Sequence, residues 1–258
     1  MSTFADPRLL FGHRGANLRC PENTVPAFIA AIEDGANALE LDVQLTSDGV
    51  VVVMHDDDGR RMCGSPGAVS DTPFATVKNW DPGAGFVDAA GARSFARRGL
   101  TVPRLADVLQ AFPGIPINID LKSPDPRGIG RVVDVVTALG AADRVLLTSF
   151  HDDVVAGVRS SSWSGRVGFS KGDIYSLLFL PLLVLRRRRA RGDRVQLPVK
   201  AGPIRLDAPR FIDKMHELKI AVDYWVINDR AEGERLLAAG ADGLMSDDPK
   251  VLAPLLLR

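Results

Sequence analysis

The sequence predicts a single α/β domain of the (β/α)₈ TIM-barrel class over residues 1–258, and three observations support this prediction. Short β-branched or aliphatic segments alternate with amphipathic helical segments along almost the whole chain. Eight strands alternating with helices remain when one arm of a β-hairpin is counted outside the barrel. The chain length of 258 residues is typical of this fold. A doubly wound open sheet is the alternative, but no glycine-rich phosphate loop follows the first predicted strand.

The composition is that of a soluble globular protein. Hydrophobic residues make up 46% and charged residues 25% of the chain, and the formal net charge is zero. Because there is no overall basic charge, we expect no nucleic-acid partner. The two cysteines, Cys20 and Cys63, suffice neither for a disulfide framework nor for a zinc cluster, so we expect free thiols. The N-terminus has no signal-peptide pattern, and no apolar run reaches the roughly 18–20 residues of a transmembrane helix, which predicts a cytoplasmic protein.

The chain begins with a predicted β-α-β unit. Residues 9–12 form a short apolar strand that runs directly into His13 and Arg14. Helical apolar spacing follows, and Asn23 is in position to be the N-cap of this helix. Residues 37–43 form the next strand, so the two strands should be parallel and joined by a right-handed crossover.

The second strand continues into a predicted antiparallel hairpin, because the turn Thr46-Ser47-Asp48-Gly49 is too short to join parallel strands. Glu40 and Asp42 lie two residues apart on the first arm and therefore point to one face. If the hairpin closes symmetrically on its two central turn residues, Asp42 pairs with Val53 and Glu40 pairs with His55. A slip of one residue in this register would turn His55 to the opposite face.

Residues 57–103 interrupt the alternation of strands and helices. This segment is rich in glycine and proline and has no sustained periodicity, although residues 72–80 could form one short helix. Its four large aromatic side chains argue against disorder. Because so long an irregular stretch inside a compact domain is usually functional, we expect a small insertion that caps the site.

The remaining elements alternate regularly. The predicted strands are 115–122, 145–150, 166–169, 195–199, 221–227 and 243–246, and the predicted helices are 105–112, 128–139, 153–159, 174–191, 209–218 and 231–239. In a (β/α)₈ barrel the active site lies at the C-terminal ends of the strands, so the polar side chains at those ends are the candidates.

Three carboxylates converge at these strand ends in the predicted barrel. They are Glu40 and Asp42 on the second strand and Asp120 on the third. A single carboxylate at a strand end is more often a loop or cap partner, but three together favour a hard divalent cation, Mg²⁺ or Ca²⁺. Zinc would need more nitrogen or sulfur ligands, and the chain has only four histidines.

Two histidines and two basic residues accompany the carboxylates. His13 follows the first strand and His55 follows the returning arm of the hairpin, so both are candidates for general acid–base catalysis. Arg14 and Lys122 carry the charge that an anionic phosphate requires. Together these residue types indicate a metal site with an acid–base pair beside it and with positive charge suited to an anionic phosphate.

Several motifs also resemble those of the glycerophosphodiester phosphodiesterase family in order and spacing. They are His13-Arg14-Gly15, Pro21-Glu22-Asn23-Thr24, Glu40-Leu41-Asp42-Val43, Thr46-Ser47-Asp48-Gly49, Val53-Met54-His55-Asp56, Asp120-Leu121-Lys122, Ser149-Phe150, Trp225-Val226-Ile227-Asn228 and Asp242-Gly243-Leu244-Met245-Ser246-Asp247. The resemblance spans nearly the whole chain. It implies a metal-dependent (β/α)₈ barrel that hydrolyses glycerophosphodiesters to glycerol 3-phosphate and an alcohol.

Carried over to this chain, the resemblance implies a role for each candidate residue. Glu40 and Asp42 would bind the metal, and His13 and His55 would be the acid–base pair. The third metal carboxylate of the family is usually a Glu, and here it is the shorter Asp120.

The resemblance also implies substrate contacts. Arg14 and Lys122 would hold the phosphate, and Phe150 and Trp225 would line the alcohol pocket, although either aromatic side chain could equally be barrel packing. Glu22 could adjust Arg14, or could simply be a favourable charge in the first turn of the helix.

The segment 177–191 does not fit the family pattern. Nine mostly aliphatic residues precede a cluster of arginines, and this run is too short to span a bilayer. It could lie in the interface of an anionic membrane, or it could be an outer barrel helix with a solvated basic end.

Two other functions compete with the leading one. A lysophospholipase D or cyclising phospholipase would act on membrane lysophospholipids with the same residues. A binding protein with weakened catalysis would be favoured by the substitution at Asp120.

Overall fold

We describe the protein from a computed structural model. The structure describes residue 4 and residues 8–123, 125–188 and 192–256.

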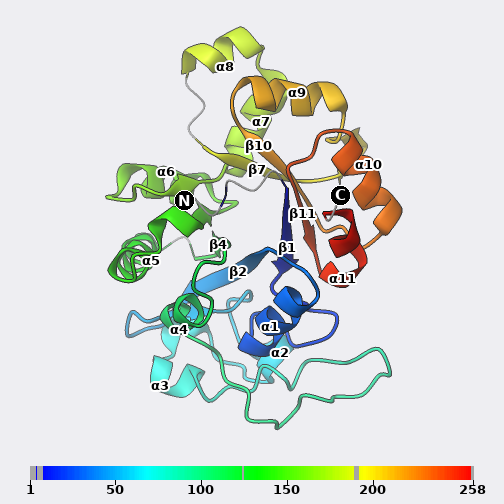
Figure 1. Cartoon of the computed structure of the whole chain (residues 1–258). Helices are drawn as coiled ribbons and strands as arrows, with labels where there is room; N and C mark the ends of the chain where they lie inside the picture. Colours follow the sequence, from blue (N-terminus) through cyan, green and yellow to red (C-terminus); the bar gives the residue numbers. More distant parts are fainter. Residues whose placement is uncertain (1–3, 5–7, 124, 189–191, 257–258) are drawn as a thin grey trace.

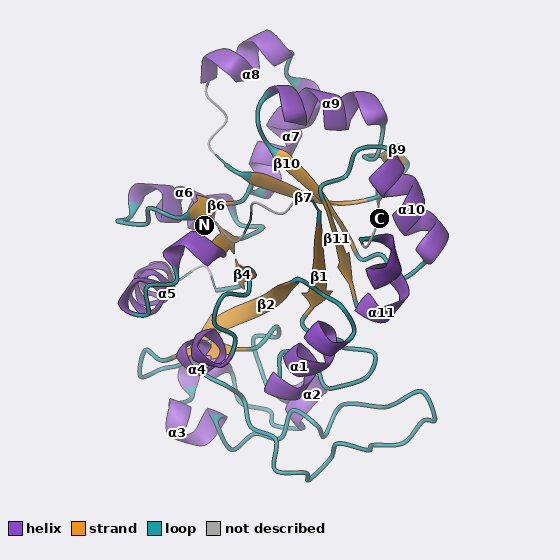
Figure 2. Cartoon of the chain, in the orientation of Figure 1, coloured by secondary structure: helices purple, strands orange, loops and turns teal. Residues whose placement is uncertain are grey.

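Eight parallel strands form a nearly closed barrel, as the sequence predicts (Figures 1 and 2). Around the barrel they follow the order β6-β5-β4-β2-β1-β11-β10-β7, and a parallel bridge between Gly168 and Arg194 joins the two ends. The barrel strands are β1 Leu9–His13, β2 Ala38–Leu45, β4 Ile117–Leu121, β5 Val145–Thr148, β6 Arg166–Val167, β7 Arg194–Pro198, β10 Ala221–Trp225 and β11 Gly243–Ser246. The hairpin arm β3 Val51–Val53 pairs with β2 and makes an isolated antiparallel bridge to Arg104, and it stays outside the barrel, also as predicted.

Helices cover the outside of the barrel (Figure 2). They are α1 Val25–Glu33, α4 Leu105–Ala111, α5 Pro126–Ala138, α6 Asp152–Ser160, α7 Lys171–Phe179, α8 Leu182–Arg188, α9 Pro209–Glu217, α10 Arg230–Ala238 and α11 Pro249–Leu252, with short turns η2 Ala142–Arg144 and η3 Ala253–Leu255. α5 shows why they pack there: Ile129, Val132, Val133 and Val136 recur at helical spacing and are all buried against the barrel. A small antiparallel pair, β8 Lys200–Ala201 and β9 Ile204–Arg205, was not predicted.

Alternation along the strands separates two faces. On β2, Leu39, Leu41 and Val43 belong to the main core under the helices. The intervening Glu40 and Asp42 point to the barrel interior and line its pocket. Deeper in the interior, a separate apolar cluster includes Phe4, Leu9, Phe11, Ala38, Leu146 and Met245. The interior is therefore packed at depth and polar at the C-terminal end of the strands.

The hairpin register differs from the prediction by one residue. The observed pairs are Val43 with Val53 and Leu45 with Val51, so the loop has three residues rather than two. Gly49 takes the positive φ of 80° that such a loop needs, whereas a symmetrical turn on Ser47-Asp48 would need left-handed backbone at non-glycine residues. His55 still lines the pocket, because β3 ends at Val53 and the pleat no longer sets its direction.

Two helix predictions were also wrong. The predicted helix 174–191 is broken at Leu180-Pro181 into α7 and α8, because proline cannot continue a helix, and residues 189–191 lie outside the described residues. The N-cap of α1 is Thr24, whose side chain accepts a hydrogen bond from the Ala27 backbone N–H. Asn23, predicted as the cap, has φ 58° and turns its amide toward Asp42 instead.

The insertion 57–103 has a small core of its own. It contains the short helices α2 Arg60–Cys63 and α3 Phe74–Val77 and the turn η1 Val69–Asp71. Cys63, Val69, Val77 and Trp80 are buried together there. In Figure 1 the insertion lies on the α1 side of the barrel. It flanks the site rather than covering it, since the pocket lining found in the described residues includes none of 57–103.

Candidate active site

A pocket of about 260 Å³ opens at the C-terminal ends of the barrel strands. All nine predicted site residues line it: His13, Arg14, Glu40, Asp42, His55, Asp120, Lys122, Phe150 and Trp225. These residues are spread over more than two hundred positions of the sequence, and the parallel strands bring them to one end of the barrel.

His13 is the last residue of β1, and Asp247 holds its imidazole. His13 Nδ1 lies 2.6 Å from Asp247 Oδ1. Asn17 and Asn228 donate to the two oxygens of the same carboxylate at 2.6 and 2.9 Å, which fixes its position. Burial alone would lower the pKa of His13, but the hydrogen bond to Asp247 and the charge of Glu40 outweigh it, so the pKa is raised.

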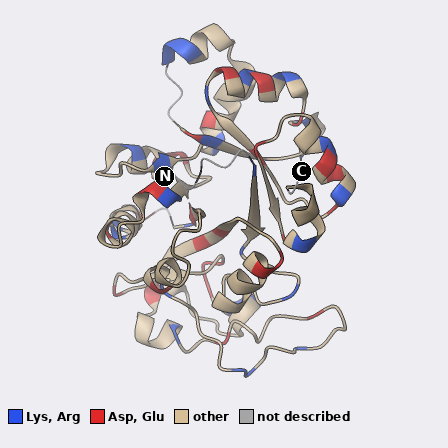
Figure 3. Cartoon of the chain, viewed as in Figure 1, with Lys and Arg blue, Asp and Glu red and all other residues tan. Residues whose placement is uncertain are grey.

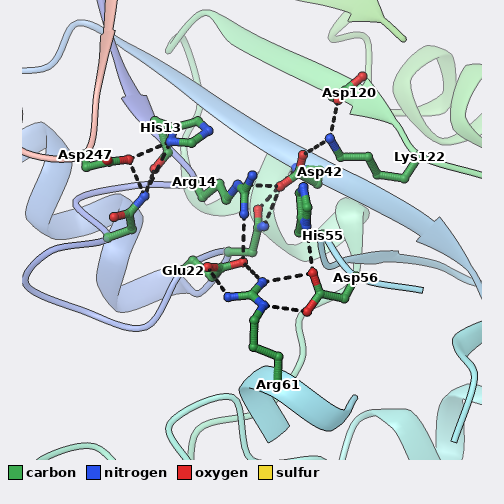
Figure 4. Close-up of polar contacts among 12 residues, drawn as sticks. His13, Arg14, Glu22, Asp42, His55, Asp56, Arg61, Asp120, Lys122 and Asp247 are labelled. Atoms are coloured by element: carbon green, nitrogen blue, oxygen red, sulfur yellow. Dashed lines mark hydrogen bonds and ion pairs between the residues drawn. The ribbon is translucent and has the colours of Figure 1, made fainter. Parts of the chain in front are cut away.

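His55 occupies the side of the site that adjoins the insertion, and it is held in the same way (Figure 4). Its Nδ1 lies 2.7 Å from Asp56 Oδ1. Asp56 in turn accepts two hydrogen bonds from Arg61 of α2, and Arg61 also binds Glu22. In both histidines Nδ1 is therefore engaged by a carboxylate, which leaves Nε2 for the pocket.

Arg14 is surrounded by carboxylates. Its backbone N–H donates to Glu40 Oε2 at 2.9 Å, and its Nη1 donates to Glu22 Oε1 at 3.1 Å. Its Nε lies 3.1 Å from Asp42 Oδ2, but this buried atom makes no hydrogen bond to a described residue, because the approach is poorly directed. A buried guanidinium N–H without an acceptor suits an anionic ligand.

The three predicted metal carboxylates lie on adjacent strands. Asp42 of β2 and Asp120 of β4 are register partners, and Glu40 lies two residues before Asp42. Burial and the nearby charge of Asp42 raise the pKa of Glu40 to about 7. The pKa of Asp42 is nevertheless lowered, because the positive charges of Lys122 and Arg14 outweigh its burial.

Lys122 lies between two of these carboxylates. Its Nζ is 3.0 Å from Asp42 Oδ1 and 2.5 Å from Asp120 Oδ2 (Figure 4). Burial alone would lower the pKa of Lys122, but the charges of Asp120 and Asp42 raise it, so the group stays cationic. Among the described residues, no three acidic, histidine or cysteine side chains are arranged closely enough to hold a metal ion. The chemistry of the oxygen donors fits a hard divalent cation, and the ammonium group now neutralises part of their charge.

Aromatic side chains form the rim of the pocket. Phe150 and Trp225 meet edge to face, with ring centroids 5.9 Å apart. Phe150 is 51% exposed, which is unusual for a side chain that serves only barrel packing. The pair is therefore placed to contact the organic part of a ligand.

The sequence reasoning gave no site role to six supporting residues: Asn17, Asn23, Asp56, Arg61, Asn228 and Asp247. Asp247 follows β11 at its C-terminal end, so the barrel rule could have found it. Asn23 donates to Asp42 Oδ2 at 2.8 Å and accepts from the Asp42 backbone N–H at 3.2 Å, which nothing in its local sequence indicates. Glu22 was considered, and it does contact Arg14.

Comparison with known proteins identifies relatives that match nearly the whole chain. The chain is 32% identical over 259 residues to the uncharacterized protein YqiK of Bacillus subtilis, covering 96% of this chain and 98% of the relative. It is 28% identical over 254 residues to a glycerophosphodiester phosphodiesterase of Caldanaerobacter subterraneus, covering 96% and 97% of the two chains.

A solved structure and a family model complete the comparison. The structure of an Oleispira antarctica phosphodiesterase in complex with the product sn-glycerol-3-phosphate superimposes with a TM-score of 0.77 at 21% identity, and the match covers 100% of both chains. At this identity the likeness supports the fold. The model of the glycerophosphoryl diester phosphodiesterase family matches residues 13–251. The chain belongs to the glycerophosphoryl diester phosphodiesterase family.

Proposed function

We propose that the protein is a glycerophosphodiester phosphodiesterase that hydrolyses glycerophosphodiesters to glycerol 3-phosphate and an alcohol. One observation carries this proposal beyond family membership. Two histidines, each with Nδ1 engaged by a carboxylate, line one pocket together with Arg14 and Lys122. Cleavage of a phosphodiester needs a base for the nucleophile, an acid for the leaving alkoxide and positive charge at the phosphate.

The two histidines form the acid–base pair in this proposal. One imidazole removes the proton from the nucleophile, and the other protonates the leaving oxygen. The carboxylates of Asp247 and Asp56 keep each ring in the tautomer that presents Nε2 to the substrate, and they stabilise the imidazolium when it forms. The nucleophile is either water or the 2-hydroxyl of the glycerol, and the second route passes through a cyclic phosphate.

Arg14 and Lys122 bind the phosphate oxygens. The buried Nε of Arg14 has no described hydrogen-bond partner, and the ammonium of Lys122 borders the same pocket. Phe150 and Trp225 would contact the alcohol portion. Carboxylates already orient both cations, so their side chains lose little conformational entropy when the substrate binds.

Glu40, Asp42 and Asp120 would hold one divalent cation, Mg²⁺ or Ca²⁺. Such an ion polarises a phosphoryl oxygen and lowers the pKa of an oxygen nucleophile. Asp120 is one methylene shorter than the usual Glu, and both Asp42 and Asp120 already pair with Lys122, so Glu40 would be the ligand with the least competition from this ammonium group. The raised pKa of Glu40 supports the proposal, because a neighbouring cation would favour its charged form.

A panel of metals and substrates tests the proposed activity. Purified protein is incubated with Mg²⁺, Ca²⁺ or EDTA and with glycerophosphocholine, glycerophosphoethanolamine, glycerophosphoinositol or a lysophospholipid, and phosphorus NMR identifies the products. We expect glycerol 3-phosphate in the presence of a metal ion. His13→Ala and His55→Ala should each lower kcat by roughly 10²–10⁴-fold while the protein stays folded.

Three outcomes would contradict the proposal. Hydrolysis that is insensitive to EDTA would contradict the role of a metal ion. Near-normal turnover in either histidine variant would contradict the acid–base assignment. Absence of all hydrolysis would favour a binding protein with weakened catalysis.

We further propose that α7 and α8 contact an anionic membrane surface. Tyr175, Phe179 and Leu183 are 53%, 69% and 61% exposed. The arginines Arg186–Arg188 follow on α8, where Figure 3 shows a basic end. Exposed aromatic and aliphatic side chains next to a basic cluster are typical of helices that lie in a membrane interface. No helix in the described part of the chain is long and apolar enough to cross a membrane.

This surface favours lysophospholipids as a second class of substrate. Ile174 of α7 lines the pocket, and Tyr175 and Phe179 of the same helix are exposed, so one helix borders both the pocket and the apolar surface. An acyl chain could follow that helix. The lysophospholipid in the substrate panel tests this candidate, since a lysophospholipase D releases the head group and a cyclising enzyme releases a cyclic phosphate.

A further inference from the structure

Arg61 is the residue through which the insertion reaches the active site. It lies on α2, and its guanidinium contacts two carboxylates from distant parts of the chain (Figure 4). Nε and Nη2 donate to Asp56 at 2.7 and 3.0 Å, and Nη1 and Nη2 donate to Glu22 at 2.9 and 2.7 Å. Because the guanidinium is planar and rigid, these four hydrogen bonds fix the two carboxylates relative to each other.

Each of these carboxylates also holds a residue of the pocket. Asp56 Oδ1 lies 2.7 Å from His55 Nδ1, and Glu22 Oε1 accepts from Arg14 Nη1 at 3.1 Å. Arg61 is therefore connected through one carboxylate to an imidazole and through the other to the guanidinium of Arg14. It does not line the pocket itself.

We propose that Arg61 is a positioning residue that aligns His55 and Arg14 at the same time, so that the insertion completes the active site. This inference rests on the proposed function, in which His55 transfers a proton and Arg14 binds phosphate. A fixed Asp56 holds the proton of His55 on Nδ1, which keeps Nε2 directed to the pocket. A fixed Glu22 holds the Arg14 guanidinium at the angle at which its Nε makes no hydrogen bond to a described residue.

The exposure of Arg61 separates positioning from stability. Its side chain is 48% exposed and belongs to neither hydrophobic cluster of the strand before His55, so its replacement removes polar contacts and no apolar packing of those clusters. The pKa of Glu22 and that of Asp56 are both lowered, because the Arg61 guanidinium outweighs the effect of their burial. Loss of Arg61 would leave two carboxylates without a common cation, free to turn away from their partners.

The kinetic test compares Arg61→Ala and Arg61→Lys with the neighbouring control Arg60→Ala. Arg60 is 72% exposed and lies 3.4 Å from Asp58, and it is not among the described residues that line the pocket. We expect Arg61→Ala to lower kcat/KM about 10–100-fold, as loss of an outer hydrogen-bond partner typically does. Both parameters should change, with kcat falling through His55 and KM rising through Arg14. Arg61→Lys should recover only part of the loss. The ammonium keeps the positive charge, but it cannot bind both carboxylates bidentately. Arg60→Ala should behave as the wild type.

Double variants test whether Arg61 acts through its two partners. In an Asp56→Asn background, Arg61→Ala should have a smaller effect on kcat than in the wild type. In a Glu22→Gln background, it should have a smaller effect on KM. Additive losses in both backgrounds would overturn the proposal.

Nitrogen-15 NMR of the imidazole rings gives a readout that does not depend on turnover. The wild-type His55 should show one tautomer with the proton on Nδ1, and Arg61→Ala should show a mixture. Wild-type kinetics and an unchanged tautomer in Arg61→Ala would reject the role of Arg61 while leaving the proposed function intact. If the wild type hydrolyses no glycerophosphodiester, the proposed function fails, and the tautomer still decides whether Arg61 positions His55. Should Arg61→Ala not fold, Arg61→Lys carries the same comparison.

Discussion

At the residue scale, the site consists of charged side chains that hold one another in place. His55, Asp56, Arg61, Glu22 and Arg14 form a continuous series of contacts, which continues through Asp42 to Lys122 and Asp120 (Figure 4). Such a series keeps the proposed catalytic groups oriented before a substrate arrives, which is the condition for electrostatic catalysis. His13 does not belong to this series; it contacts Asp247 instead, so its contribution can be tested separately.

The pair of His13 and Asp247 should make folding stability depend on pH. The pKa of His13 is raised, so its contribution is complete below the unfolded value of about 6.5 and is lost as the pH rises through the folded value. The pKa of Asp247 is lowered, because its hydrogen bonds outweigh burial, so its contribution is complete above about 3.9 and is lost as the pH falls. The pair therefore contributes most between about pH 4 and 6.5.

Asp247→Asn should lower the free energy of unfolding by on the order of 1–2 kcal/mol at pH 5.5, the difference between a charged and a neutral hydrogen bond. The loss should be smaller at pH 8.5. Urea denaturation of metal-free protein at both pH values measures it, and the exposed Asp213→Asn on α9 is the control. Equal losses at the two pH values would show that the charge of His13 is not involved.

At the scale of elements, the alternation of side chains along the strands predicted the interior face correctly, whereas the turn residues did not lead to the correct hairpin register. Spacing two residues apart placed Glu40 with Asp42 and Asp120 with Lys122 on the interior face, and all four line the pocket. The hairpin register was missed because the loop type depends on which residue takes a positive φ. Gly49, which takes a φ of 80°, could have indicated the three-residue loop. The break at Pro181 could have been read from the sequence, since proline ends a helix.

The surface of α7 and α8 gives a prediction about membrane binding. In vesicle flotation, the protein should bind vesicles of phosphatidylglycerol and phosphatidylcholine, and binding should weaken as salt is added because anionic lipid attracts the arginines. Phe179→Glu with Leu183→Glu should abolish binding, because both exposed apolar side chains are replaced by acidic ones.

Ile29→Glu provides the matched control for this experiment. Ile29 is an apolar residue of α1 that is 46% exposed, and Figure 1 shows α1 on the other side of the barrel from α8. This variant should bind vesicles as the wild type does. No flotation with anionic vesicles at low salt would mean that α8 is simply an outer helix with a solvated basic end.

At the scale of the whole molecule, the order of elements was predictable and the long-range partners were not. The count of eight strands and the exclusion of β3 followed from local sequence patterns. The contact between His13 and Asp247 joins residues 234 positions apart, and only the closed barrel brings them together. The insertion has little periodicity, so neither its core nor the reach of Arg61 could be derived from the chain alone.

Binding of Mg²⁺ or Ca²⁺ should stabilise the whole barrel if the carboxylates hold a metal ion. At a concentration near a hundred times Kd, binding adds about 2.7 kcal/mol to the free energy of unfolding. For a domain of this size we expect the Tm to rise by about 5–10 °C. Differential scanning calorimetry with either ion and with EDTA measures the change. The rise should be lost in Glu40→Gln, and an identical Tm with and without the ions would argue against the site.

The hairpin arm β3 belongs to two hydrophobic clusters at once. Val51 and Val53 are part of the main barrel core, whereas Val52 and Met54 are part of the core of the insertion. The insertion therefore cannot separate from the barrel without exposing one side of this strand to water, which is costly for β-branched side chains. His55 directly follows Met54 and therefore lies at the boundary between the two cores. Its place in the pocket is thus anchored by apolar packing on both sides of the preceding strand, and an insertion of another length would have to keep both this boundary and the guanidinium of Arg61 to leave the proposed site complete.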